Sequence, residues 1–86
     1  MPKVADLPRK IVIRQFYGDH PPPHFHAEQG DDEVLLRIDD LSIYKGSLST
    51  RSLATVRAWA HLRRSKLLKN WEAAEAGQPI REITSP

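Results

Sequence analysis

The fold is decided by the stretch HFHAEQGDDEVLLRI, residues 24–38. Polar and apolar residues alternate at its start, so His24 and His26 should point to one face of a strand and Phe25 to the other. A turn around Gly30 separates this strand from a second apolar run. The stretch therefore predicts a β-hairpin with one polar and one apolar face.

Further segments extend this hairpin on both sides. The β-branched run at residues 10–16 and the alternating run at residues 41–45 predict neighbouring strands. Residues 79–83 predict a short C-terminal strand. The predicted fold class is α+β, in which a small antiparallel meander of three or four strands packs against two helices.

The two helices are predicted from the capping residues and from the apolar stripe between them. Ser49 or Thr50 can cap the first helix, and Gly77 can end the second. One continuous helix would be about 40 Å long at ~1.5 Å per residue, so a break near Arg64 and Ser65 is expected. The stripe that should face the sheet comprises Leu53, Val56, Ala60, Leu67 and Trp71, and Trp59 and Leu62 lie off it.

Length and composition limit both the domain count and the site chemistry. The chain has 86 residues and no cysteine. One domain over residues 1–86 is expected, with flexible termini at about 1–8 and 84–86. Without thiolates, His, Asp and Glu are the protein ligands left for a metal. No apolar run approaches the ~20 residues that cross a bilayer and no signal peptide is evident, which predicts a cytoplasmic protein with no membrane association.

Charge is divided unevenly along the chain. Residues 19–40 hold one base, Arg37, and the acids Asp19, Glu28, Asp31, Asp32, Glu33, Asp39 and Asp40. Residues 50–71 hold no acid and the bases Arg51, Arg57, Arg63, Arg64, Lys66 and Lys69. This division predicts either that the two halves face one another or that the basic half meets an anionic partner.

The concentrated chemistry lies in the sequence DHPPPHFH, which begins at Asp19. Its three prolines predict a stiff, extended loop. His24 and His26 can converge on a divalent cation such as zinc, and His20 can approach across the prolines. Asp19 or Glu28 can complete the site. A metal-binding protein or metal-dependent enzyme centred on these three histidines is one functional prediction.

Proton transfer without a metal is a second interpretation. Two imidazoles can act as general acid and base on a phosphodiester. Arg57 and Arg64 lie three or four positions from His61, so they can hold an anionic substrate beside it. If the acidic hairpin packs near the basic helices, the catalytic histidines should share one cleft. They are His20, His24, His26 and His61. This pattern fits a small metal-independent ribonuclease.

A structural interpretation uses the same residues. Asp19 would orient His20, His24 would bond a backbone carbonyl, and Phe25 would fill the core. The rigid motif also suits docking to another protein. The basic helices fit a solvated face better than a nucleic-acid site, because no helix-turn-helix motif or stacking aromatic series accompanies their charge.

Several motifs carry a family resemblance. They are Asp19-His20, Pro22-Pro23-His24-Phe25-His26-Ala27, Gly30, Asn70-Trp71-Glu72 and Gly77-x-Pro79. Over residues 8–83 the chain resembles a family of small bacterial proteins classed as a domain of unknown function, whose hallmark is Asp-His-x-Pro-Pro-His-Phe-His. His61 matches a histidine that the family carries. Gln29 and Ser65 depart from its usual aromatic residue and acid.

The resemblance implies one component of a two-protein module. Such pairs have been interpreted as toxin and antitoxin, which is an analogy from gene arrangement. The histidine-rich loop would be the working surface. Leu62 and Trp59 are expected to contact a partner protein or a second copy, because they lie off the main helical stripe. The metal-dependent enzyme and the metal-independent ribonuclease are the alternatives.

Overall fold

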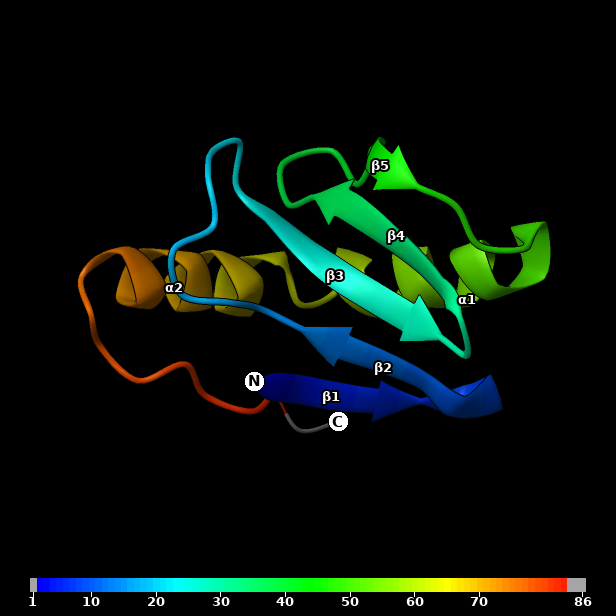
Figure 1. Ribbon diagram of the computed structural model, residues 1–86, viewed down its shortest axis with the longest axis horizontal. Coiled ribbons are helices and arrows are strands. Elements are labelled where there is room, and N and C mark those ends of the chain that lie inside the picture. The colour runs from blue at the N-terminus through cyan, green and yellow to red at the C-terminus, as the bar shows by residue number, and fades with distance from the viewer. Residues whose placement is uncertain (1, 84–86) are drawn as a thin grey trace.

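Five antiparallel strands lie in chain order in one sheet, and two helices cover one face of it (Figure 1). The computed structural model describes residues 2–83. Its elements are β1 (Lys3–Leu7), a 3-10 turn (Pro8–Lys10), β2 (Ile11–Arg14), β3 (His24–Gln29), β4 (Asp32–Arg37), β5 (Ile43–Gly46), α1 (Thr50–His61) and α2 (Arg64–Glu75). The predicted α+β meander with two helices is confirmed, and the strand number is corrected from three or four to five.

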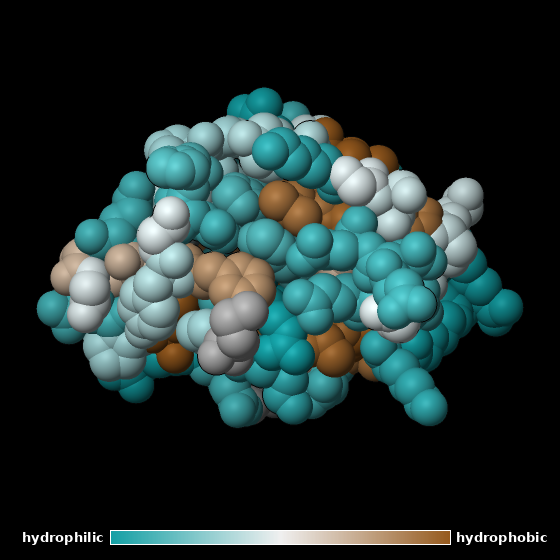
Figure 2. All heavy atoms as spheres, in the orientation of Figure 1, coloured by the Kyte–Doolittle hydropathy of each residue, from teal (hydrophilic) through white to brown (hydrophobic). Residues whose placement is uncertain are grey.

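The β3–β4 hairpin separates a core face from an open face. Phe25 lies opposite Leu36 and Ala27 opposite Val34, and all four side chains are fully buried. This confirms that Phe25 fills the core. The alternate residues His26 and Glu28 are only partly buried and point to the open face, which is turned away from the helices and is largely hydrophilic (Figure 2).

Both predicted helices form, with the predicted break between them. The Ser49 hydroxyl accepts a hydrogen bond from the Ser52 backbone N–H at 3.2 Å and caps α1. Gly77 ends α2 with a φ of +71°. The stripe residues Val56, Ala60, Leu67 and Trp71 are buried, whereas Leu62 is 77% exposed. Within residues 2–83, neither helix combines the length and the apolar character needed to span a membrane.

The first eight residues depart from the sequence expectation. Residues 1–8 are expected to be flexible, yet Lys3–Leu7 pairs with β2 as the edge strand β1. Val4 is 1% exposed and belongs to the core. The segment before Pro8 is too short to show a period, so its strand character comes from tertiary pairing and not from its own pattern.

The C-terminal segment also differs. No strand forms at residues 79–83, which corrects the predicted C-terminal strand. The side chain of Asn70 bonds both the N–H and the carbonyl of Arg81, so these groups are not available to a sheet ladder. Ile83 still donates its N–H to the Val4 carbonyl at 2.9 Å and is buried. The predicted flexibility of residues 84–86 lies outside the described residues.

Candidate functional site

Three side chains converge at the start of β3. His24 and His26 extend from β3, with ring centroids 5.3 Å apart, and Asp19 reaches them from the β2–β3 loop (residues 15–23). Asp19 Oδ2 lies 3.0 Å from His26 Nε2 and 3.4 Å from His24 Nε2. One ligand atom from each residue falls within 4.8 Å of the others. We call these three residues the triad.

The prolines of the β2–β3 loop fix the first histidine. The backbone oxygen of Pro22 lies 2.7 Å from His24 Nδ1, and the oxygen of Pro23 accepts a hydrogen bond from the Ile38 N–H at 3.0 Å. A carbonyl oxygen only accepts, so Nδ1 carries the proton and donates it. In neutral His24 the lone pair is then on Nε2, the atom that faces Asp19. Two acceptors oppose one another there unless a proton or a cation lies between them.

The second histidine lies between two carboxylates. His26 Nδ1 is 3.0 Å from Glu33 Oε2, and His26 Nε2 is 3.0 Å from Asp19 Oδ2. Ionised carboxylates only accept hydrogen bonds, and a neutral imidazole donates one. When Nδ1–H donates to Glu33, the Nε2 lone pairs of both histidines face the same Asp19 oxygen. Metal-binding histidines in proteins show this pattern, with the far nitrogen bonded to a carboxylate or a carbonyl.

Aromatic rings enclose the histidines. Phe16 meets the His26 ring edge-on at 4.5 Å, and Tyr44 and Trp71 lie 5.3 and 5.2 Å from the His24 ring. The His24 side chain is only 4% exposed, whereas the aspartate of the triad is 26% exposed. The rings lower the local dielectric and so strengthen electrostatic contacts, while the aspartate side keeps an approach from solvent.

Two further residues of the predicted metal site lie outside the triad. His20 is exposed and is not among the converging ligands of the described residues. Glu28 accepts a hydrogen bond from Arg14 Nε at 3.0 Å, so it is engaged within the sheet. Of the two acids predicted for the metal site, Asp19 is therefore the one that contacts His24 and His26.

The residues predicted on the first helix gather at a different place. His61 and Arg57 line an open recess of about 680 Å³, together with Asp40 and the exposed Leu62. Arg57 Nε donates to the Leu41 carbonyl at 3.0 Å. The structure brings His61 and Arg57 together as the sequence suggests, but it does not bring them to the triad.

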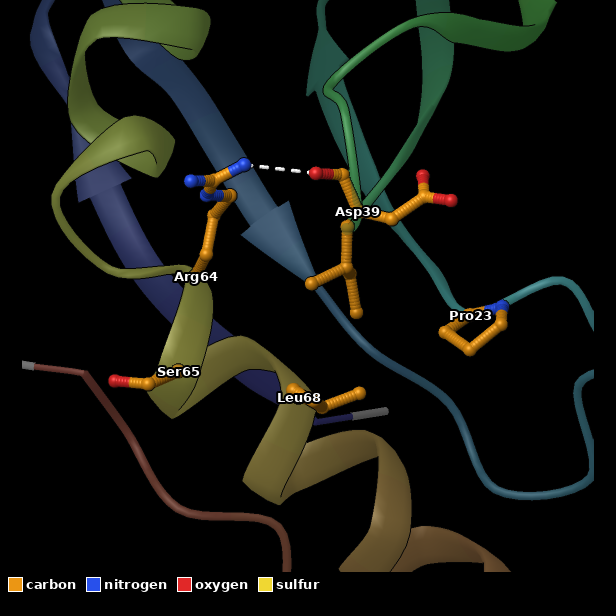
Figure 3. A pocket seen from close by; sticks show the side chains of 6 residues that line it. Pro23, Asp39, Arg64, Ser65 and Leu68 are labelled. Carbon is orange, nitrogen blue, oxygen red and sulfur yellow. Dashed lines mark hydrogen bonds between the residues drawn. The ribbon is translucent and has the colours of Figure 1, made fainter.

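Arg64 lies at a third place, near Asp39 and near Pro23 at the end of the β2–β3 loop. Its Nη1 donates to the Asp39 carbonyl at 2.7 Å (Figure 3). The adjacent recess of about 340 Å³ has Pro23, Ile38 and Leu68 among its lining residues. The basic and acidic halves do meet at these two places, but Arg57 and Arg64 each bond a backbone carbonyl and not a carboxylate.

Comparison with protein families identifies the chain. A family model described as a domain of unknown function (DUF4160) matches residues 11–72, which is more than half of the sequence. The protein belongs to the DUF4160 family. Separate comparisons with curated proteins and with solved structures found no match. The matched range of the DUF4160 model includes the whole triad, both strands of the central hairpin and most of α2.

One site residue of this DUF4160 domain was missed by reasoning from the sequence. The sequence around Glu33 is typical of an exposed acidic turn, yet the Glu33 carboxylate forms a hydrogen bond with Nδ1 of His26. The hairpin register carries the signal, because His26 pairs with Leu35, and Glu33 lies two positions away on the same face of β4. Placing the turn at Gly30 is enough to find this contact.

Proposed function

We propose that this protein binds a divalent transition-metal ion through Asp19, His24 and His26. One observation carries the proposal. The Nε2 atoms of both histidines face one carboxylate oxygen of Asp19, one ligand atom from each of the three residues lies within 4.8 Å of the others, and Nδ1 of each ring has an oxygen partner of its own. A cation between these atoms relieves the acceptor repulsion and satisfies all three side chains.

The donor set indicates the class of metal. Two imidazole nitrogens and one carboxylate oxygen suit zinc, iron, cobalt or nickel better than magnesium or calcium, which prefer oxygen ligands. Three protein ligands also leave at least one coordination position for water or another molecule, as in exchangeable zinc sites. Such a metal would supply Lewis-acid chemistry to whatever binds there. This supports the metal-dependent alternative predicted from the sequence.

Three other predictions remain separate from this proposal. Membership of a two-protein module, including a toxin–antitoxin pair, rests on the family resemblance. The 77% exposure of Leu62 supports contact with a partner protein or a second copy. The cytoplasmic location also stays a prediction.

Direct titration of the protein tests the metal site. Protein purified without a polyhistidine tag is freed of metal with a chelator and titrated with cobalt(II), whose visible absorption reports nitrogen and oxygen coordination. We expect one bound ion per chain and competition by zinc(II). His24→Ala should remove the absorption, because it removes a nitrogen ligand.

His61→Ala is the matched control, since it removes a histidine that lies away from the triad. Circular dichroism of both variants shows whether the fold is retained. Asp19→Asn provides a second test at the most accessible ligand. Equal cobalt binding by folded His24→Ala, Asp19→Asn and wild-type protein would contradict the proposal, as would absence of binding by the wild type.

A further inference from the structure

A second polar surface lies between α2 and the C-terminal segment (residues 78–83). It is a recess of about 250 Å³. Lys66 and Lys69 line it from α2 and Arg81 lines it from the segment, while Glu82 is the acid among its lining residues. Three positive charges thus face one negative charge. We call this surface the basic groove.

A buried polar network fixes the two walls of the basic groove. Asn70 is 5% exposed; its Nδ2 donates to the Arg81 carbonyl at 2.8 Å, and its Oδ1 accepts from the Arg81 N–H at 3.0 Å. The same Nδ2 donates to Gln15 Oε1 at 3.0 Å, and Gln15 is itself bonded to the Leu67 carbonyl. The backbone at Arg81 is therefore held against α2, the helix that carries the two lysines.

The cations of the basic groove differ from two arginines of the helices. Arg57 and Arg64 donate to loop carbonyls. Across residues 2–83, the side chains of Lys66, Lys69 and Arg81 make neither a hydrogen bond nor an ion pair. Neighbouring like charges raise the local potential and concentrate anions. The charge division of the sequence is thus left unneutralised at this groove.

We infer that the basic groove binds the phosphate backbone of a nucleic acid. A single strand carries one phosphate per nucleotide, so neighbouring phosphates can meet the three cations in turn. No aromatic side chain is among the groove's lining residues, so the contacts go to phosphates and not to stacked bases. Binding should therefore tolerate any base sequence. The inference uses none of the triad residues.

Salt-dependent binding tests the inference. Fluorescence anisotropy follows labelled single-stranded RNA and DNA oligonucleotides with the full chain, in the presence of a chelator so that the metal site plays no part. Three phosphate contacts predict a slope of about −2 for log affinity against log salt, which is about a 20-fold loss between about 50 and 200 mM. The combined variant Lys66→Gln, Lys69→Gln, Arg81→Gln should abolish this slope.

A matched variant removes the same charge elsewhere, through Lys10→Gln, Lys45→Gln and Arg51→Gln. It should keep the wild-type affinity and slope, and circular dichroism should show that both variants fold. Equal losses in the two variants would overturn the inference, because diffuse charge would then explain binding. Tighter binding of polyglutamate or of anionic lipid vesicles would also overturn it, as would no binding by the wild type.

Discussion

Asp19 and Asp40 lie in two neighbouring loops and have opposite kinds of hydrogen-bond partner. The β2–β3 loop and the β4–β5 loop (residues 38–42) are joined by the hydrogen bond from the Ile38 N–H to the Pro23 carbonyl. In the β4–β5 loop, Asp40 accepts the backbone N–H and the hydroxyl of Ser42 at 2.9 and 2.7 Å. Both donors belong to Ser42, two residues further along the chain, so the Asp40 carboxylate has its hydrogen-bond donors within its own turn.

The β2–β3 loop gives its aspartate a different environment. Within the described residues, the hydrogen bonds and ion pairs of Asp19 go only to ring nitrogens, and Nε2 of both His24 and His26 faces its carboxylate. A carboxylate that faces hydroxyl and amide donors is structural, whereas one that faces imidazole acceptors is complete only with a proton or a cation. The comparison therefore teaches that the partner atoms, and not the aspartates, distinguish a turn from a metal site.

The largest expected effect comes from deleting a ligand beside Asp19. His26→Ala should weaken zinc(II) binding by more than about 100-fold, because losing a ligand should exceed the effect of losing an outer-shell partner. Isothermal titration calorimetry on metal-free protein measures the change. Ser42→Ala, in the other loop, should leave the zinc affinity unchanged. Similar affinities for the two variants would erase the distinction between the loops.

A smaller loss of zinc(II) affinity is expected when His26 is kept but the hydrogen-bond acceptor of its Nδ1–H is removed. Glu33→Ala removes the acceptor of His26 Nδ1–H and should weaken zinc(II) binding by about 10- to 100-fold. Glu28→Ala is the control, since this acid pairs with Arg14. If both variants bind zinc like the wild type, Glu33 does not orient the ring.

A substitution that removes a contact of the β4–β5 loop should lower the stability of the fold and leave metal binding unchanged. Arg57→Ala removes the bond to the Leu41 carbonyl, and Leu41 holds a left-handed φ of +61° that needs such support. We expect the free energy of unfolding to fall by about 1.5 kcal/mol, as for a hydrogen bond to a charged group. Urea denaturation measures it, with Arg51→Ala as the exposed control. A change in zinc affinity with unchanged stability would reverse the assignment.

Local patterns were sufficient to predict the central hairpin and the helices. The alternation around Phe25 correctly separated core from open face, and the caps at Ser49 and Gly77 correctly bounded the helical region. These features depend on neighbours in sequence. Strand β1 could not be predicted in this way, because Val4 is buried only through pairing with β2. The C-terminal segment failed for a related reason, since Asn70 competes for its backbone groups.

The candidate site was predicted in part. Spacing alone predicted that His24 and His26 lie close together, and the rigid loop suggested a carboxylate nearby. Spacing could not choose between Asp19 and Glu28, nor separate His61 from the other histidines, because these outcomes depend on how the loop folds back on the sheet. The hydrogen bond to Glu33 required the hairpin register.

The smallest expected effect concerns Asp40, the aspartate that accepts hydrogen bonds within its own turn. Hydrogen bonds from the side chain and the backbone of Ser42 hold the pKa of Asp40 below its ordinary value. A carboxyl group whose pKa is lowered on folding stabilises the fold above its unfolded pKa of about 3.9, and this contribution is lost as the pH falls through the folded value. The thermal midpoint of wild-type protein should therefore exceed that of Asp40→Asn slightly near neutral pH, and the difference should shrink below about pH 4. Asp31→Asn, at an exposed turn residue, should show no such convergence. If the difference in thermal midpoint between wild type and Asp40→Asn instead grows as the pH falls, Ser42 does not hold Asp40 in its charged form. Asp40 would then no longer be an example of a structural aspartate to compare with Asp19.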